Sequence, residues 1–266
     1  MYSQNESNSQ KYMKKIIFIA LIFFTLNSQA QIPNFKSLQG LTKTANSPVS
    51  NAEMIEGLKN SLNIGIEKAV GSLGIENGFY NDAVLKLLLP PEAKQITNNI
   101  RLLPGGQDLV NKTVLSLNRT AEDAVKEATP IFKNAILKMS ITDAMGILFG
   151  KENAITEYLR QNTYSELQAA FAPKVKVSLS KPLVANVSTN QTWNLLCSNY
   201  NGVANSTVGK FSRLKPVNVN LEEYVTEKAL NALFIKVAAE EKAIRSNPVA
   251  RVNDLLKKVF GQLDKK

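Results

Sequence analysis

The strongest constraint on the fold is the recurrence of apolar residues at every third or fourth position of the sequence. The clearest case lies between Ser50 and Gly74, where Ser50 and Glu53 have the spacing of a helix capping box. Positions three and four apart share one face of a helix, so this segment is predicted to be an amphipathic helix. Its apolar positions are Met54, Leu58, Leu62, Ile66, Ala69, Val70 and Leu73.

Similar patterns predict helices through the middle of the chain. A helix over 90–103 is expected, because its two leading prolines suit the first turn of a helix. The next apolar pattern covers 109–128 and reaches Pro130, which favours either a kink or a new helix capped by Thr129. Of these two outcomes, we expect a break at the proline.

In the second half of the chain, polar residues three apart mark the predicted helix starts. Ser140 and Asp143 open a helix that closes at Gly150, and Thr163 and Glu166 open another that runs beyond Pro173. The other elements predicted here are a short helix at 153–161, a helix at 182–200, a long loop at 202–218, a helix at 221–245 capped by Asn220, and a last helix that begins after Asn247 and ends before Gly261.

The amino terminus has the order of a secretory signal peptide. Lys14 and Lys15 precede an apolar run of about eleven residues, which ends in a tripeptide of small residues at 28–30. The run is too short for the ~20 residues of a membrane-spanning helix. We expect cleavage after Ala30 and export to the periplasm. The single cysteine, Cys197, lies far from that point, so no lipid anchor is expected there.

These observations divide the chain into four predicted parts. Residues 1–30 are a signal peptide with an upstream extension, and 31–50 form a flexible leader rich in Ser, Thr, Asn and Pro. Residues 51–261 form the folded domain, and 262–266 are a carboxy-terminal tail. No segment alternates at the period of two typical of strands, so the fold class is all-α: a multi-helix bundle in a single domain, without a transmembrane segment after processing.

The absence of histidine excludes the commonest catalytic arrangements. It removes the usual general base near neutral pH, the commonest zinc ligand and every Ser-His-Asp or Cys-His constellation. No phosphate loop, dinucleotide motif or paired cysteine motif is present, so neither a cofactor nor a metal is predicted. Cys197 stands beside two leucines, which favours an inert thiol over a nucleophile. The glutamates that remain as candidate general acids are Glu122, Glu157, Glu227, Glu240 and Glu241.

The formal net charge of +10 falls to +8 on processing, because three lysines and one glutamate are removed. This excess favours anionic envelope partners, or it is a solvated surface without a specific ligand. Nucleic acid is not expected as a partner, because basic residues alternate with acidic ones instead of clustering with aromatic residues.

Two polar sets on predicted helices are the candidate ligand cluster. Asn118, Arg119 and Glu122 lie three and four positions apart, so they share one helix face and either cross-link helices or line a pocket for an anionic ligand. In the helix over 221–245, Glu240 and Glu241 precede Arg245, and Glu241 has the spacing of an ion pair with it. Arg245, Arg251 and Lys257 form either a basic rim or an ordinary surface, of which the second is favoured.

Several sequence motifs occur together near the carboxy terminus and in the middle of the chain. They are Leu221 to Leu230 (LEEYVTEKAL), Leu233-Phe234, Ala239 to Glu241, Ile244-Arg245, Asn247-Pro248, Arg251, Leu255 to Gly261, Asn118-Arg119, Ala121-Glu122, Gly150 and Ala154 to Tyr158. In this combination, the region from Leu58 to Gly261 resembles the domain-of-unknown-function family 4197. The resemblance implies an exported helical protein of Gram-negative bacteria, and it implies no activity.

The sequence therefore favours a non-enzymatic periplasmic protein that binds an envelope component or a small apolar or anionic ligand. The alternative is a hydrolase that uses a carboxylate to cleave envelope glycan. The missing catalytic residue types favour the first hypothesis.

The predicted export can be checked on the protein itself. If the precursor is expressed in a Gram-negative host, the periplasmic fraction should contain a chain that starts at Gln31, because the small residue Ala30 ends the cleavage motif. Intact mass and amino-terminal sequencing measure this. An uncleaved chain in the cytosol would contradict the prediction.

Overall fold

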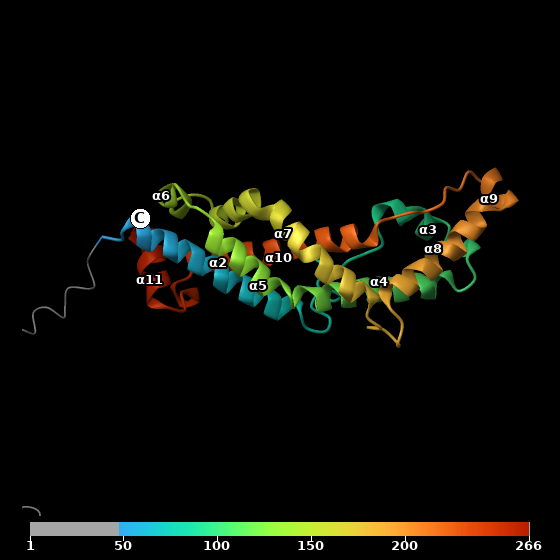
Figure 1. Ribbon diagram of the computed structural model, residues 1–266, viewed down its shortest axis with the longest axis horizontal. Helices are drawn as coiled ribbons and strands as arrows, with labels where there is room; N and C mark the ends of the chain where they lie inside the picture. Colours follow the sequence, from blue (N-terminus) through green and yellow to red (C-terminus); the bar gives the residue numbers. More distant parts are fainter. Residues whose placement is uncertain (1–47, 266) are drawn as a thin grey trace, which may run out of the picture. The chain divides into compact units, whose positions relative to one another are not determined.

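The computed structural model describes residues 48–265 of the chain (Figure 1). The predicted signal peptide, most of the predicted leader and Lys266 lie outside the described residues. Within the described part of the chain there are ten α-helices and no strand, apart from one isolated bridge between Val184 and Val187. The predicted all-α multi-helix fold is confirmed. The helical unit begins at Val49.

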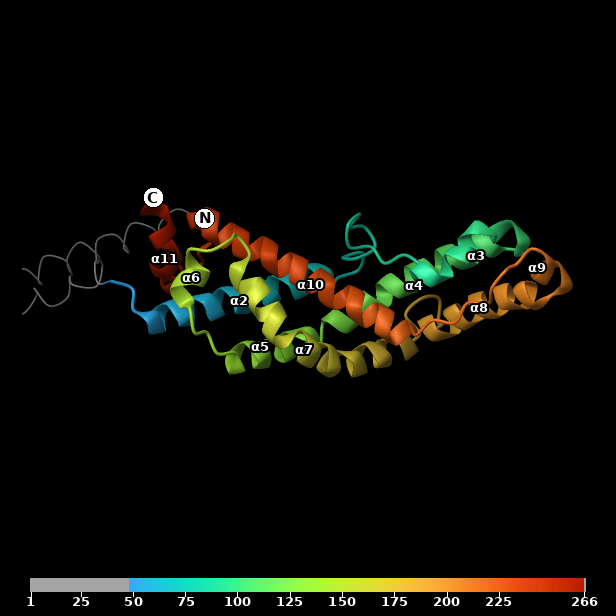
Figure 2. The same cartoon turned by 90° about the horizontal axis from the view of Figure 1, so that it is seen from above.

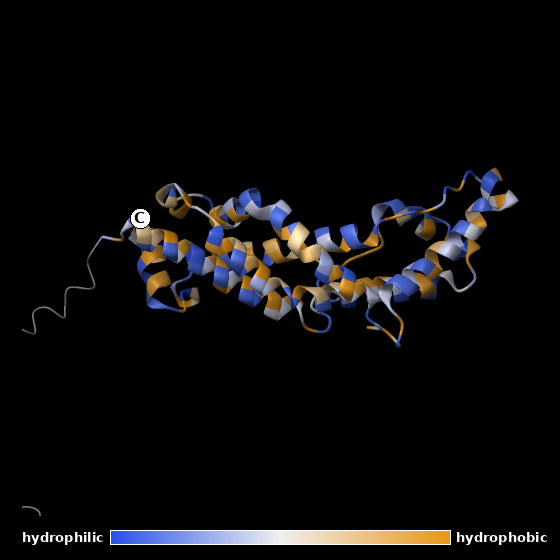
Figure 3. Ribbon diagram, viewed as in Figure 1, coloured by the Kyte–Doolittle hydropathy of each residue, from blue (hydrophilic) through white to orange (hydrophobic). Residues whose placement is uncertain are grey.

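Two long helices form the centre of the domain. Helix α2 (Asn51–Leu73) has the predicted capping box, in which the Ser50 hydroxyl accepts from Glu53 N at 3.2 Å and Glu53 Oε2 accepts from Ser50 N at 2.9 Å. Helix α10 (Leu221–Ser246) has the predicted cap Asn220 and makes its most extensive contacts with α2 and α7 (Ala154–Ser180). In Figure 3 apolar and polar residues alternate along each of these helices, as expected where one face is buried.

Figures 1 and 2 show two groups of helices joined by α7 and α10. One group contains α2, α5 (Ala128–Lys138), α6 (Ala144–Leu148) and α11 (Asp254–Phe260). The other contains α3 (Lys94–Asn98), α4 (Gly106–Val125), α8 (Thr189–Asn205) and α9 (Thr207–Phe211). The 3₁₀ helices are η2 (Pro91–Ala93), η3 (Ile100–Leu102), η4 (Pro248–Ala250) and η5 (Gly261–Lys265).

Several predicted helix boundaries were wrong in the first half of the chain. The helix expected at 90–103 is divided into η2, α3 and η3. Helix α3 ends at Asn99, whose side chain and main-chain N–H both donate to Gln95 O. The break expected at Pro130 occurs earlier, between Val125 and Ala128. Proline is tolerated in the first turn of α5, where its missing N–H has no helical partner.

The predicted helix starts in the second half were also partly wrong. Asp143 caps α6 by accepting from Gly146 N at 2.7 Å, so Ser140 does not open the helix. Thr163 is not a cap, because its hydroxyl donates to Leu159 O and the two helices expected at 153–161 and after 163 are one helix, α7.

The predicted boundary between the helix at 182–200 and the loop at 202–218 was wrong by more residues. Residues 182–188, expected to be helical, form a loop with two positive-φ residues, Ala185 and Asn186. Helix α8 starts at the capping box of Ser188 and Gln191, and it extends into the expected loop as far as Asn205. Asn, Ser and Thr are weak helix formers but strong caps, which explains why the pattern placed this helix too early. The last α-helix begins at Asp254, capped by Asn253.

Glycine allows α2 to lie close to α11, which gives a direct test of the arrangement. A Cβ added to Gly57 would lie 2.6 Å from Val259 Cγ2, whereas one added to Gly71, in the same helix, would meet no atom within 4 Å. We expect Gly57→Ala to lower the free energy of unfolding by about 1–3 kcal/mol. Gly71→Ala should raise it by about 0.5–1 kcal/mol, because alanine favours the helix. Urea unfolding measures both. Equal effects of the two variants would show that the helices do not meet at Gly57.

Candidate functional site

The predicted cluster on α4 attaches a loop to the helix. Asn118 is fully buried, and its carboxamide forms two hydrogen bonds with the main chain of Leu87: Oδ1 accepts from Leu87 N at 2.9 Å and Nδ2 donates to Leu87 O at 2.8 Å. The same Nδ2 also donates to Val114 O at 2.7 Å. The Asn118 carboxamide makes all three of these hydrogen bonds to main-chain groups of the protein, so this side chain holds the segment around Leu87 in place.

Arg119 and Glu122 hold the preceding part of that loop. Glu122 is buried, and its Oε1 accepts from the main-chain N–H groups of Phe79 and Tyr80 at 3.1 and 3.2 Å. Its Oε2 accepts from Arg119 Nη1 at 2.6 Å. Arg119 Nη2 reaches Glu76 Oε1 at 3.1 Å and Asn77 Oδ1 at 2.9 Å. These contacts fit a structural role better than recognition of an anionic ligand, because the guanidinium already has two carboxylates as partners.

The second predicted pair caps two helices. Glu241 is buried and accepts from Ile155 N at 3.1 Å and from Thr156 N at 2.9 Å, the first free N–H groups of α7. Asn153, the N-cap residue of α7, makes no capping hydrogen bond with its side chain. The Glu241 carboxylate of α10 takes the place of that cap at the positive end of the helix dipole. Arg245 pairs with Glu241 at 2.7 Å and donates to Ile147 O and Leu148 O at the end of α6.

The other charged candidates lie apart from this pair. Glu240 is half-exposed and forms an ion pair with Lys68 at 2.7 Å, so it does not join its neighbour Glu241. Arg251 is buried; it donates to Ile244 O and Arg245 O at the end of α10 and pairs with Asp264. Arg245 and Arg251 therefore form neither a basic rim nor an ordinary surface, and only Lys257 is exposed.

The structure places the six candidate residues in two separate sets and an isolated ion pair. Asn118, Arg119 and Glu122 meet in contacts with the loop at 76–87, whereas Glu241 and Arg245 meet at α6 and α7. None of the six lines any of four grooves on the described part of the chain. Charge and spacing identified residues that hold the fold together.

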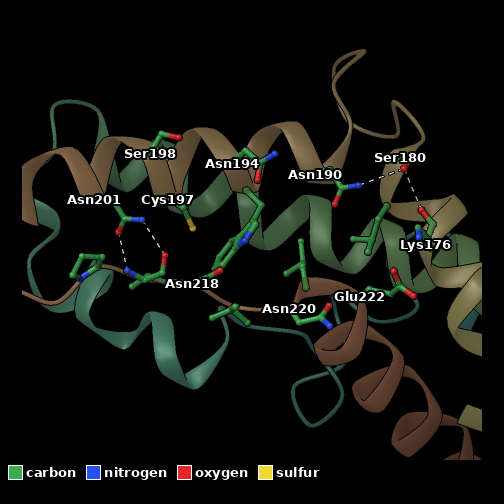
Figure 4. Close-up of a pocket in the computed structure, with 16 residues that line it drawn as sticks. Lys176, Ser180, Asn190, Asn194, Cys197, Ser198, Asn201, Asn218, Asn220 and Glu222 are labelled. Atoms are coloured by element: carbon green, nitrogen blue, oxygen red, sulfur yellow. Dashed lines mark hydrogen bonds between the residues drawn. The ribbon is translucent and has the colours of Figure 1, made fainter. Parts of the chain in front are cut away.

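The largest of these grooves, with a volume of about 710 Å³, lies between α8, the end of α7 and the segment 216–222 (Figure 4). We call it the amide groove, because side-chain amides line both of its sides. Figure 4 shows those of α8 on one side and those of the facing segment on the other. The amide-bearing residues are Asn190, Asn194, Asn201, Asn218 and Asn220.

One end of the amide groove is closed by an amide that binds the main chain. Asn201 Oδ1 accepts from Val217 N at 2.7 Å and its Nδ2 donates to Val217 O at 3.0 Å. This is the same pair of hydrogen bonds that Asn118 makes with Leu87. Farther along α8, Asn190 is half-buried and its Nδ2 donates to Ser180 Oγ at 3.4 Å, whereas Asn194 is exposed. A carboxamide offers one acceptor and two donors, so Asn194 can bind a second chain.

The ionisable groups of the amide groove are few. Glu222 is the single carboxylate among the described residues that line it, and Lys176 is the single amine. Cys197 also lines it, and burial raises the pKa of its thiol to about 11. A thiol with this pKa is a poor nucleophile near neutral pH, which agrees with the inert thiol predicted from the sequence. The groove thus offers hydrogen bonds and few groups for acid-base or nucleophilic chemistry.

The asparagines of α8 were missed as site residues. Their spacing of four and seven positions places Asn190, Asn194 and Asn201 on one helix face, and this periodicity was the signal that could have identified them. This periodicity was overlooked because asparagine is a poor helix former, and asparagines in a segment are usually taken to indicate a loop.

The fold and its contacts define an all-α protein whose buried charges cap helices and whose principal groove is lined by neutral amides. The family described as "Protein of unknown function (DUF4197)" matches residues 48–261, and the chain belongs to this family. The resemblance found in the sequence is confirmed. No curated protein matches the chain, and no solved structure matches it. No helix in the part of the chain described here has the length and apolar character needed to cross a membrane.

The structural role of Glu241 can be separated from the role of its neighbour. Glu241→Ala should lower the free energy of unfolding by about 3–5 kcal/mol, because it leaves Arg245 buried without its partner. Glu240→Ala, which removes a partly exposed ion pair from the adjacent position, should cost about 0–1 kcal/mol. Chemical unfolding followed by circular dichroism measures both values. Similar small losses in the two variants would show that Glu241 does not hold α7.

Proposed function

We propose that this protein is a non-enzymatic binding protein of the bacterial envelope, and that its amide groove takes an extended peptide segment. The proposal joins the export signal expected at residues 1–30 with the chemistry of the amide groove. Its ligand is recognised through main-chain amides, so sequence specificity is expected to be low.

The observation that carries the proposal is the contact between Asn201 and Val217. It places a side-chain amide of α8 against both polar groups of one main-chain residue, at the end of the amide groove. Asn118 makes the same contact with Leu87 inside the domain. The fold thus uses a carboxamide twice to hold a non-helical segment, and the exposed carboxamide of Asn194 lines the same groove without a hydrogen-bond partner in the described chain.

The spacing between Asn194 and Asn201 suits an extended chain. Asn194 lies seven residues before Asn201, which corresponds to two helical turns and about 10 Å along α8. An extended strand covers about 10 Å in three residues. A peptide bound at Asn194 would therefore lie about three extended residues along the groove from the point where Asn201 binds Val217.

A peptide fits the groove better than a glycan does. Sugar sites combine hydrogen-bonding groups with exposed aromatic faces, on which a ring can stack. Trp193 is the one aromatic residue among the described residues that line the groove, and only 5% of its surface is exposed. The amides can bind a polar chain, but no aromatic face is open to a sugar ring.

No contact favours the alternative, a glycan hydrolase that uses a carboxylate. Both standard mechanisms of glycoside cleavage need a pair of carboxyl groups on either side of the bond. Glu222 stands without a second carboxylate in the lining of the groove, and Glu122 and Glu241 are held by main-chain N–H groups and arginines elsewhere. These facts support a binding role.

An array of uncharged twelve-residue peptides tests the proposal with the processed protein as the probe. We expect binding to a subset of the peptides, and Asn194→Ala should weaken it about tenfold, because it removes two hydrogen bonds of about 0.5–1.5 kcal/mol each. Methylation of main-chain nitrogens at alternate positions of a bound peptide should abolish binding, because it removes the donors without changing the side chains.

Asn199→Ala is the matched control, because Asn199 is exposed on α8 but does not line the groove. It should bind like the unaltered protein. Soluble glycan strands released from sacculi serve as the competing ligand. Glycan binding that depends on Asn194 would refute the peptide assignment, and peptide binding that does not depend on Asn194 would refute the groove assignment.

A further inference from the structure

The short helix α9 and the turn after it, residues 207–215, carry exposed apolar side chains. We call this segment the basic tip. Phe211 is 91% exposed and Val208 is 66% exposed, and Phe211 has the largest exposed fraction among the large apolar side chains of the described chain. Single exposed apolar residues are common on protein surfaces, but Val208 and Phe211 lie three positions apart on one helix and so form an adjoining exposed pair.

The charge around these side chains has one sign. From Leu167 to Leu221 the sequence contains no Asp or Glu, while it contains six Lys and Arg residues. Three of the six are the exposed residues Lys210, Arg213 and Lys215 of the basic tip. None of these three forms an ion pair within residues 48–265. The segment that carries the exposed apolar side chains thus also carries three exposed cations without ion-pair partners in the described chain.

The conformation of the basic tip is fixed by contacts with the rest of the domain. Ser206 caps α9 by accepting from Gly209 N at 3.1 Å, and Leu214 N donates to Gly209 O at 2.9 Å. Lys215 N donates to Gln95 Oε1 at 3.1 Å, which ties the turn to α3.

Gly209 lies directly against α8, because an added Cβ would be only 2.1 Å from Val203 O. The tip is therefore held in place on the domain. Its backbone has a defined course, so the exposure of Phe211 is a property of the fold.

The position of the basic tip suits contact with a surface. In both views α9 lies beyond the end of α8, on the side of the domain away from α2 and α11 (Figures 1 and 2). A plane can approach this end without meeting the other helix group first.

We infer that the basic tip docks on a lipid bilayer that contains anionic phospholipid. Basic residues are attracted to the negative surface potential of such a bilayer, and an apolar side chain beside them gains by entering the region between headgroups and acyl chains. The long stems of Lys and Arg allow their charged ends to stay at the phosphate level while Phe211 enters more deeply. The inference does not depend on the proposed peptide binding, because no residue of α9 lines the amide groove.

Co-sedimentation with vesicles tests this surface. The processed protein should sediment with vesicles of phosphatidylglycerol and phosphatidylethanolamine and remain in solution with vesicles of phosphatidylcholine. Phe211→Ser should weaken binding about tenfold, as expected for the loss of one buried aromatic side chain. The triple variant Lys210→Gln, Arg213→Gln, Lys215→Gln should weaken it about a hundredfold, or about fivefold for each charge.

Matched variants away from the basic tip serve as controls. Leu137→Ser removes another exposed apolar side chain, which is 76% exposed on α5. Lys126→Gln, Lys138→Gln, Lys151→Gln removes the same number of exposed charges. Both variants should bind like the unaltered protein. Equal losses in the control and tip variants would overturn the inference, because they would show only a non-specific attraction of the net charge.

Fluorescence distinguishes insertion of the ring from adsorption of the charges. In Phe211→Trp, brominated phospholipid should quench emission from the new indole, whereas buried Trp193 of the unaltered protein should not be quenched. Binding without quenching, or no sedimentation with anionic vesicles, would refute docking of the tip. Binding to a protein partner through Phe211 in the absence of lipid would assign the surface to a different class of partner.

Discussion

The buried pair of Glu241 and Arg245 is the interaction on which the position of three helices depends. The first N–H groups of α7 and the Leu148 carbonyl at the end of α6 have no partners within their own helices, and these residues are buried. One turn of α10 supplies both partners. The desolvation of the two charges is offset only because each forms several hydrogen bonds, so the arrangement tolerates the loss of neither residue. This explains why an isolated-looking helical ion pair in the sequence is buried in the structure.

The structure also shows which parts of the fold depend on local sequence and which do not. Helices α2 and α10 were predicted closely, because Ser50, Glu53 and Asn220 cap their own helices through residues three positions away. The start of α7 was also predicted closely, by the short helix expected at 153–161, although its distant cap Glu241 could not be identified from local sequence. The error lay at Thr163 and Glu166, whose spacing predicts a new helix start, whereas in the structure the helix continues through them.

The candidate site was predictable in the same partial way. Asn118, Arg119 and Glu122 were expected to act together, since their spacing alone puts them on one face; in the structure all three bind the loop at 76–87. The sequence could not decide whether these three residues join helices or line a pocket, because that depends on the segment that faces them. The facing segment is the loop at 76–87, which has no periodic pattern that would have predicted its position. The amides of α8 were missed because charge drew attention to residues that stabilise the fold. Neutral hydrogen-bonding groups with no internal partner are the better indicator of an open site here, and Asn194 is one of them.

Helix α7 connects the capping carboxylate with the amide groove. It has 27 residues, which corresponds to a length of about 40 Å; its first turn is bound by Glu241, and Lys176 and Ser180 of its last turns line the groove. Pro173 lies inside the helix, three residues before Lys176, and a proline at such a position cannot donate the helical hydrogen bond and favours a bend. The direction of the last turns, and with it the place of Lys176 and Ser180 on the rim, is therefore set at the proline as well as at the capped end.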